Sequence, residues 1–315
     1  ESVSRLGLAA AGLGGRAREA AFFARSAVRV SLGAARRLAT DPLGALGEGA
    51  RTATSVARIV APATRRRSPV FRGVSLGWSF DAIEVPLAGL RSAAAQAGGT
   101  LNDAFLAAVT GGLRRYHTHH GAPVDGLRVD MPISYRASDD ALGGNRFVPA
   151  RFTIPVGGPV DPVERMRLLG VLARSIRNEP ALPLTDALAG VLNRLPPLAT
   201  TTVFASMLKG VDFVATNIAG APSPVYLAGA GVLADYAFAP PSGAAFNIAL
   251  LSHVDKACVG ILSDRLAVAD PEVLLRCLRE GFDEVLAAAP RPRSGRAARR
   301  RAERVPSNGK AGALP

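Results

Sequence analysis

The order of strand-like and helix-like segments between residues 74 and 288 constrains the fold of this 315-residue chain most. Runs of β-branched and apolar residues bounded by turn residues predict strands at 74–85, 127–135, 147–156, 211–217, 225–238, 244–254 and 257–263. Helical periodicity predicts helices at 87–96, 100–116, 162–177, 184–194, 200–209 and 271–288. This mixture indicates an α/β fold, in which helices flank a mixed, largely antiparallel sheet.

The helix predicted from Thr100 to Tyr116, with the sequence TLNDAFLAAVTGGLRRY, begins with a polar pair, Asn102 and Asp103. In one interpretation Thr100 is the N-cap and Asp103 completes a capping box, so the pair only starts a helix. In the other, the same pair lies at the rim of a reaction chamber. The segment alone is compatible with both interpretations.

The charge is unevenly distributed along the chain. The net charge is +13, but residues 1–77 hold +9 and residues 290–315 hold +7, which leaves the residues between them at −3. Only three lysines accompany 35 arginines. Because the basic residues flank the predicted domain instead of covering it, the charge argues against a nucleic-acid-binding domain.

The composition divides the chain into three parts. Residues 1–72 read as an amphipathic helical linker, residues 73–289 as the α/β domain, and residues 290–315 as a disordered basic tail. The helical pattern of residues 2–62 fits an interdomain linker or a helix on a membrane surface, and amphipathicity does not separate the two.

No apolar run of 18 residues predicts a membrane span, and arginines interrupt any signal-peptide core. With only Cys258 and Cys277, no disulfide framework is indicated, so a cytoplasmic protein is expected, with peripheral contact at the inner face of the cell membrane left open. Since the sequence begins with Glu1, the natural start is expected upstream.

One motif imitates a catalytic site. Gly73 to Gly77 fits G-x-S-x-G but lacks the strand before it and the helix after it that a nucleophile elbow needs. No set of histidines and cysteines has zinc-like spacing, so no metal site is expected. His253, near the end of a predicted strand, is expected to be structural.

Several motifs follow one another along the chain: Asn102-Asp103 with its helix, Met131 to Arg136, Leu142 to Arg146, Ile154 to Arg165, and Thr216 to Ala230. In this order they resemble the C-terminal part of the wax ester synthase/diacylglycerol acyltransferase (WS/DGAT) family. The resemblance implies half of a chloramphenicol-acetyltransferase-like fold, which packs in the intact family against a similar N-terminal half with the reaction channel between them. It also implies that Asn102, Asp103, Asn145, Asn217 and Gly220 line that channel and bind substrate.

The family's catalytic signature, HHxxxDG, is absent from this sequence. His119-His120 is followed by Asp125-Gly126, but with one residue too many between them and in the wrong place. No catalytic residue is therefore assigned, and the base is expected upstream of residue 1. A further hypothesis is that His120 catalyses the reaction within this chain alone.

The resemblance implies transfer of a long-chain acyl group from acyl-CoA to diacylglycerol or a fatty alcohol. Acyl-CoA is then a co-substrate, no cofactor is needed, and the partners are the two substrates, the missing N-terminal half and a membrane or lipid-droplet surface. The alternative is a non-catalytic protein that associates with lipid or membrane through the same half-fold.

Overall fold

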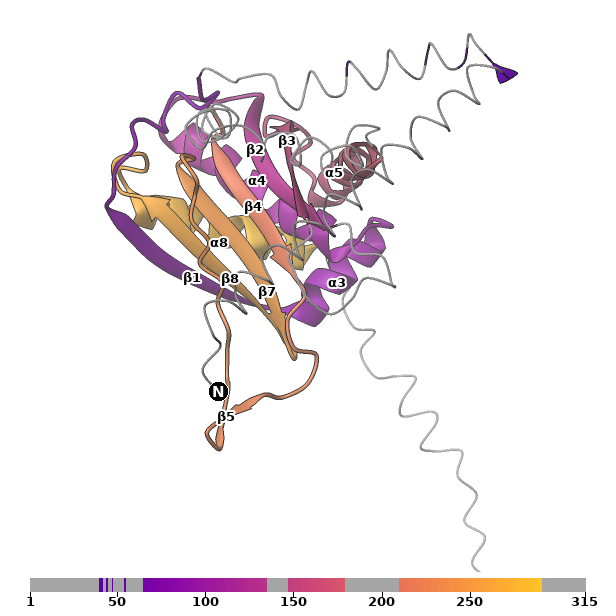
Figure 1. Ribbon diagram of the computed structural model, residues 1–315, viewed down its shortest axis with the longest axis vertical. Helices are drawn as coiled ribbons and strands as arrows, with labels where there is room; N and C mark the ends of the chain where they lie inside the picture. Colours follow the sequence, from indigo (N-terminus) through magenta and orange to yellow (C-terminus); the bar gives the residue numbers. More distant parts are fainter. Residues whose placement is uncertain are drawn as a thin grey trace, which may run out of the picture.

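The computed structural model describes residues 40–41, 44, 47, 54, 65–134, 147–178 and 210–290. Its main sheet has six strands in the order β1-β8-β7-β4-β2-β3 (Figure 1). Their bounds are β1 Trp78–Pro86, β2 Gly126–Ser134, β3 Phe147–Pro155, β4 Phe213–Ile218, β7 Phe246–His253 and β8 Lys256–Asp264. The pairs β2/β4 and β4/β7 are parallel and the other neighbours are antiparallel, which confirms the predicted mixed, largely antiparallel sheet.

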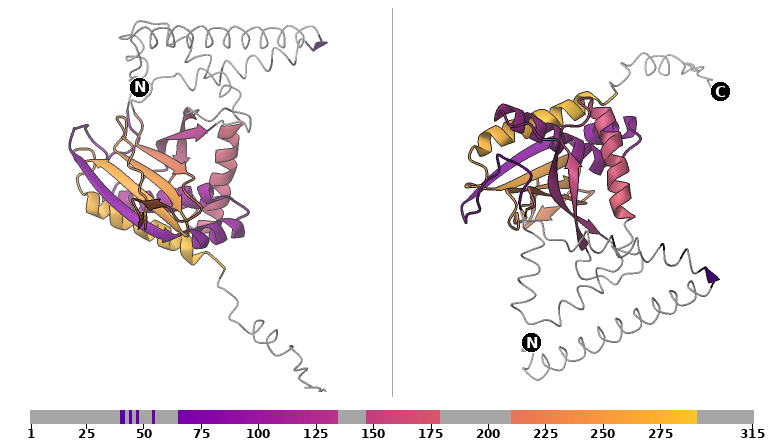
Figure 2. Two further views of the ribbon diagram at one scale, coloured as in Figure 1. Left: turned by 60° about the horizontal axis from the view of Figure 1, so that its bottom comes forward. Right: turned by 90° about the horizontal axis from the view of Figure 1, so that it is seen from above.

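The four helices of the main described segments lie on one side of this sheet (Figures 1 and 2). They are α3 (Leu87–Gln96), α4 (Leu101–His119), α5 (Pro162–Arg177) and α8 (Pro271–Ala287). Helix α4 is buried along most of its length, because α5 and α8 pack against it while the sheet covers its inner face. No helix in the described part of the chain is both long and apolar enough to cross a bilayer.

Directly opposite residues of paired strands point to the same face of a sheet, so the register separates two faces. Val129, Phe213 and Phe246 form a row that joins the main hydrophobic core under the helices. The next residue on each of these strands points to the other face, where Val214 packs in a separate small cluster with Val211 and Ala244. The sheet therefore has a helix-covered face and a second face without a described helix.

Most predicted elements are confirmed, but the strand predicted at 225–238 is wrong. Only β5 (Tyr226–Leu227) and β6 (Ala230–Gly231) form there, as a small hairpin outside the main sheet. The positive φ angles of Ala228 and Gly229 make the turn of this hairpin. Beyond this hairpin the chain crosses the second face of the sheet. There the Ala237 carbonyl lies close to Gly260, and a Cβ on Gly260 would lie 2.2 Å from the carbonyl oxygen.

The strands predicted at 244–254 and 257–263 pair as an antiparallel hairpin, whose two connecting residues are Val254 and Asp255, with Val254 at φ 54°. The helices predicted at 184–194 and 200–209, the tail 290–315 beyond its first residue, and nearly all of residues 1–64 lie outside the described residues.

Candidate functional site

The polar pair at the start of α4 is divided between two environments. Asp103 is buried, and its carboxylate accepts hydrogen bonds from the Thr100 backbone N–H (2.7 Å) and from the Thr100 hydroxyl (3.0 Å). Asn102 is half-buried on the same turn. The carboxylate thus completes a capping box with Thr100, and Asn102 is not part of that box.

Asn217 lies near the end of β4 and is exposed. Gly220 follows in a loop held against the end of β7, since its N–H donates to the Ser252 hydroxyl (3.2 Å). A Cβ on Gly220 would lie 2.1 Å from the Ser252 carbonyl oxygen, so only glycine fits this approach. Asn145 lies outside the described residues.

Asn102 and Asn217 share one end of the molecule. Helix α4 leads by a short turn into β2, which runs back along it, and β2 is parallel to β4. The beginning of α4 therefore lies at the same end of the sheet as the carboxyl end of β4. Asn102 belongs to the helix layer and Asn217 to the sheet. The described structure shows no hydrogen bond between the two side chains.

His119 and His120 lie at the opposite end of α4. A helix of 19 residues is about 28 Å long, so His120 is remote from Asn102. The His120 Nε2 atom lies 3.0 Å from Asp270 Oδ2, and the other oxygen of Asp270 accepts from the Tyr116 hydroxyl at 2.6 Å. Burial, followed by the bond to Asp270, raises the pKa of Tyr116. These contacts tie α4 to the start of α8.

His117, in the last turn of α4, is fully buried. Its Nδ1 atom lies 2.8 Å from the Leu113 carbonyl oxygen and its Nε2 atom lies 2.8 Å from the Ser68 hydroxyl oxygen. A carbonyl only accepts, so Nδ1 carries the proton and Nε2 accepts from Ser68. This serine–histidine pair is sealed from substrate, because the exposed fractions of both residues are 6% or less.

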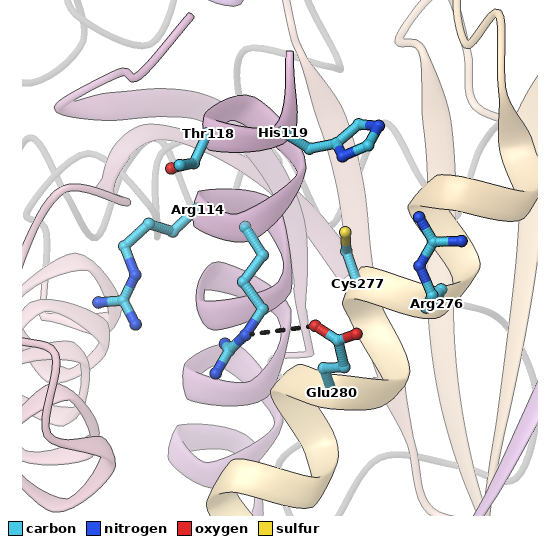
Figure 3. Close-up of a pocket in the computed structure, with 7 residues that line it drawn as sticks. Arg114, Thr118, His119, Arg276, Cys277 and Glu280 are labelled. Carbon is cyan, nitrogen blue, oxygen red and sulfur yellow. Dashed lines mark ion pairs between the residues drawn. The ribbon is translucent and has the colours of Figure 1, made fainter. Parts of the chain in front are cut away.

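A groove of about 460 Å³ lies between α4 and α8 (Figure 3). One of its arginines, Arg115, is paired with two carboxylates, since its guanidinium lies 2.9 Å from Glu284 and 3.6 Å from Glu280. Burial raises the pKa of the Cys277 thiol in this groove, so it is not an activated nucleophile. The lining residues are Arg114, Arg115, Thr118, His119, Arg276, Cys277 and Glu280.

Sequence reasoning missed two polar side chains on the second face of the sheet. Asp130 on β2 is 7% exposed and Asn247 on β7 is 2% exposed, and each has a side-chain oxygen without a hydrogen-bond partner. Burial raises the pKa of Asp130 to about 6 although the charge of Arg151 lowers it. The available signal was a carboxylate between the two apolar residues Val129 and Met131 of a predicted strand.

Across the described ranges no group of three or more histidine, cysteine, aspartate or glutamate side chains is arranged to hold a metal ion. The described polar groups can orient and bind a substrate. None of them forms an exposed nucleophile with an adjacent base.

Residues 143–285 match the family model described as the WS/DGAT C-terminal domain. The chain is 39% identical over 228 residues to a Mycobacterium tuberculosis protein named as a diacylglycerol O-acyltransferase, which covers 72% of this chain and 46% of the relative. A second M. tuberculosis protein of that name is 29% identical over 232 residues, which are 67% of this chain and 47% of the relative. The chain thus spans about half the length of the curated relatives it matches.

Solved structures share the fold. A wax ester synthase/diacylglycerol acyltransferase from Marinobacter aquaeolei VT8 superimposes with a TM-score of 0.51 at 21% identity, over 79% of this chain and 58% of that one. The cyclization-docking bidomain of a nonribosomal peptide synthetase from Sorangium cellulosum gives a TM-score of 0.52 at 11% identity, over 83% of this chain and 52% of that one. At these identities the likeness concerns the fold alone.

Proposed function

Because this chain carries the C-terminal domain of the WS/DGAT family, we propose that it is the C-terminal part of an O-acyltransferase that uses acyl-CoA. Its substrates are a long-chain acyl-CoA and a diacylglycerol or fatty alcohol. The observation that carries the proposal is the 39% identity over 228 residues with the M. tuberculosis relative. The shared fold supports it.

In this reaction the hydroxyl oxygen of the acceptor attacks the thioester carbonyl carbon, and the C–S bond breaks as the C–O ester bond forms. A base removes the hydroxyl proton, which finally resides on the coenzyme A thiol, and hydrogen-bond donors stabilise the oxyanion. We place the base outside the printed sequence, in an HHxxxDG segment. The role of this chain is to bind and orient substrates, with Asn102, Asn145, Asn217 and Gly220 at the channel.

The test is to produce the protein with the coding region upstream of Glu1 and to supply radiolabelled palmitoyl-CoA with dioleoylglycerol or hexadecanol. Labelled triacylglycerol or wax ester is the expected product, and replacing the second histidine of the upstream signature by alanine should abolish it. If the upstream region lacks the signature, or the complete protein forms neither product, the proposal is wrong.

A non-catalytic protein that associates with lipid is the second candidate, and the observation that favours it is the concentration of positive charge in residues 1–77 and 290–315. The two candidates predict different results in the same assay. An acyltransferase turns over labelled acyl-CoA when an acceptor is added, whereas a lipid-associating protein binds vesicles and leaves the thioester intact.

A further inference from the structure

The groove between α4 and α8 gathers more guanidinium groups than carboxylates. Glu284 is shared by three arginines: its oxygens lie 2.8 Å from Arg165, 2.9 Å from Arg115 and 3.7 Å from Arg114. One further carboxylate, that of Glu280, lies 3.6 Å from Arg115. Burial, followed by the charge of Arg165, lowers the pKa of Arg114, although the charge of Glu284 acts against this. Two carboxylates are thus divided among three arginines.

A fourth guanidinium, that of Arg276 in α8, lines the groove without an ion pair. Arg276 is exposed, and no carboxylate of the described residues pairs with it, including Glu272 one turn earlier on the helix. Burial, followed by the charge of Glu280, raises the pKa of the Cys277 thiol, while the charges of Arg276 and Arg115 lower it. The charges of the two arginines therefore reach the same point of the groove.

The balance of charge in the groove is positive. The four arginines and the two glutamates leave an excess of two positive charges. Asp270, whose charge also acts on Cys277, is already engaged, since it accepts from the Tyr116 hydroxyl and lies 3.0 Å from His120. Residues 78–289 carry −3 in total, so the excess in the groove opposes the charge of the domain around it.

The groove also offers the donors and the space that a phosphate group needs. Guanidinium forks bind phosphate oxygens in pairs. The Thr118 hydroxyl and the His119 ring line the same groove, and His119 and Arg276 lie beside the Cys277 thiol (Figure 3). The volume of about 460 Å³ is within the range of pockets that hold small organic molecules, roughly 300–1,000 Å³.

We propose that this groove binds a phosphate group, of free phosphate or of a phosphomonoester, with Arg276 as its main charged contact. A phosphomonoester carries a charge of about −1.5 to −2 at neutral pH, which matches the excess of two positive charges better than a carboxylate does. The volume, which exceeds what the free ion needs, favours the phosphomonoester. The groove lies at the end of α4 opposite to Asn102, so this site is separate from the candidate channel and does not rest on the proposed function.

The experiment measures the binding of radiolabelled inorganic phosphate, AMP and adenosine to this chain by equilibrium dialysis at one ionic strength. AMP should bind several-fold more tightly than inorganic phosphate, because the groove has room for more than the ion. Adenosine lacks the phosphate and should bind at least about 10-fold more weakly than AMP. Equal binding of AMP and inorganic phosphate would support the site and identify free phosphate as its ligand.

Two variants of exposed residues in the groove should change this binding in opposite directions. Arg276→Gln removes the unpaired cation and should weaken the binding of AMP and phosphate at least about 5-fold. Glu280→Gln removes a carboxylate and should strengthen it several-fold. Arg279→Gln is the matched control: it makes the same charge change on α8, but its guanidinium donates to the Ala82 carbonyl oxygen of β1 at 3.2 Å, so binding should stay unchanged.

The arginine-rich flanks are the same in every variant, so their attraction for anions does not produce these differences. Binding that Arg276→Gln and Glu280→Gln leave unchanged, or shift in the same direction, overturns the proposal once circular dichroism shows both variants folded. Binding of adenosine as tight as that of AMP, or no binding of AMP and phosphate by the wild-type chain, overturns it without any variant.

Discussion

Single residues in this protein are fixed by their hydrogen-bond partners, and His117 is the clearest case. Its ring links the Leu113 carbonyl in α4 to the hydroxyl of Ser68, and that hydroxyl also accepts from the Val70 and Phe71 N–H groups at 3.2 and 3.1 Å. The neutral ring satisfies every partner. Burial lowers the pKa of His117, because a protonated ring is poorly solvated there.

The lowered pKa predicts a loss of stability in acid. The unfolded chain binds a proton near the ordinary histidine pKa of about 6.5, whereas folded His117 binds it only at lower pH. The contribution of neutral His117 to the free energy of unfolding should therefore be complete above pH about 6.5. It should be lost as the pH falls toward the pKa of His117 in the folded protein. His117→Phe should remove this part of the pH dependence and, at pH 7.5, should cost roughly 1–3 kcal/mol because Ser68 loses its acceptor.

Urea unfolding at pH 7.5 and pH 5 measures both effects, with His119→Gln as the control, since His119 is exposed. An identical pH dependence in the wild type and His117→Phe would contradict this assignment.

Among the elements, α4 and α8 approach so closely that glycine is required at their contact. A Cβ on Gly281 would lie 2.2 Å from the Ala108 carbonyl oxygen and 2.7 Å from the Gly112 nitrogen, both of which are backbone atoms. In an open helix, glycine to alanine stabilises by about 1 kcal/mol. Here Gly281→Ala should instead destabilise by about 1–3 kcal/mol, because the helices must move apart.

Thermal unfolding of Gly281→Ala against Gly89→Ala tests this expectation. A Cβ on Gly89 in α3 meets the flexible end of the Leu286 side chain, so that variant should change stability little. If Gly281→Ala is as stable as the wild type, α4 and α8 can move apart without a loss of stability, and the expectation is wrong.

A buried arginine joins three helices. Arg165 in α5 is 1% exposed, donates to the Ala107 carbonyl oxygen of α4 at 3.0 Å and to Glu284 of α8 at 2.8 Å. Glu284→Gln leaves this guanidinium without its carboxylate and should lower the free energy of unfolding by about 3–5 kcal/mol. Glu280→Gln removes an exposed pair with Arg115 and should cost less than about 1 kcal/mol, so denaturant unfolding of the two variants should differ clearly.

Elements were more predictable than side-chain environments. The helix at 162–177 agrees with α5 because Asp161 caps it, Pro162 starts it and its periodicity is regular. The strand predicted at 225–238 is wrong because apolar composition does not reveal that the chain leaves the sheet after a turn with positive φ angles.

At the candidate site, the sequence predicted that Asn102 and Asn217 line the reaction channel, and this role stays a prediction. The sequence did not reveal that Asp130 and Asn247 share a face of the sheet. They do so only because β2 pairs with β4 and β4 pairs with β7, and no local pattern encodes such a register.

At the scale of the whole molecule, charge and fold are separated along the chain. Residues 78–289, which include nearly all of the described structure, carry −3, whereas the segments on either side carry +9 and +7. Each Lys or Arg near an anionic bilayer contributes about 1 kcal/mol of attraction, and salt screens it. Attraction of this chain to a membrane should therefore come from its flanks and not from its folded body.

Co-sedimentation with phosphatidylserine-containing vesicles tests this expectation, with phosphatidylcholine vesicles as the reference. The chain should sediment with the anionic vesicles at low salt and be released at 0.5 M salt. Replacing the seven arginines and Lys310 of residues 290–315 by glutamine should weaken binding, and removing residues 1–62 as well should abolish it. Binding that persists without both flanks would place the membrane contact on the folded domain, where the exposed apolar residues Tyr226, Leu227 and Leu233 around the β5–β6 hairpin would be the next surface to substitute.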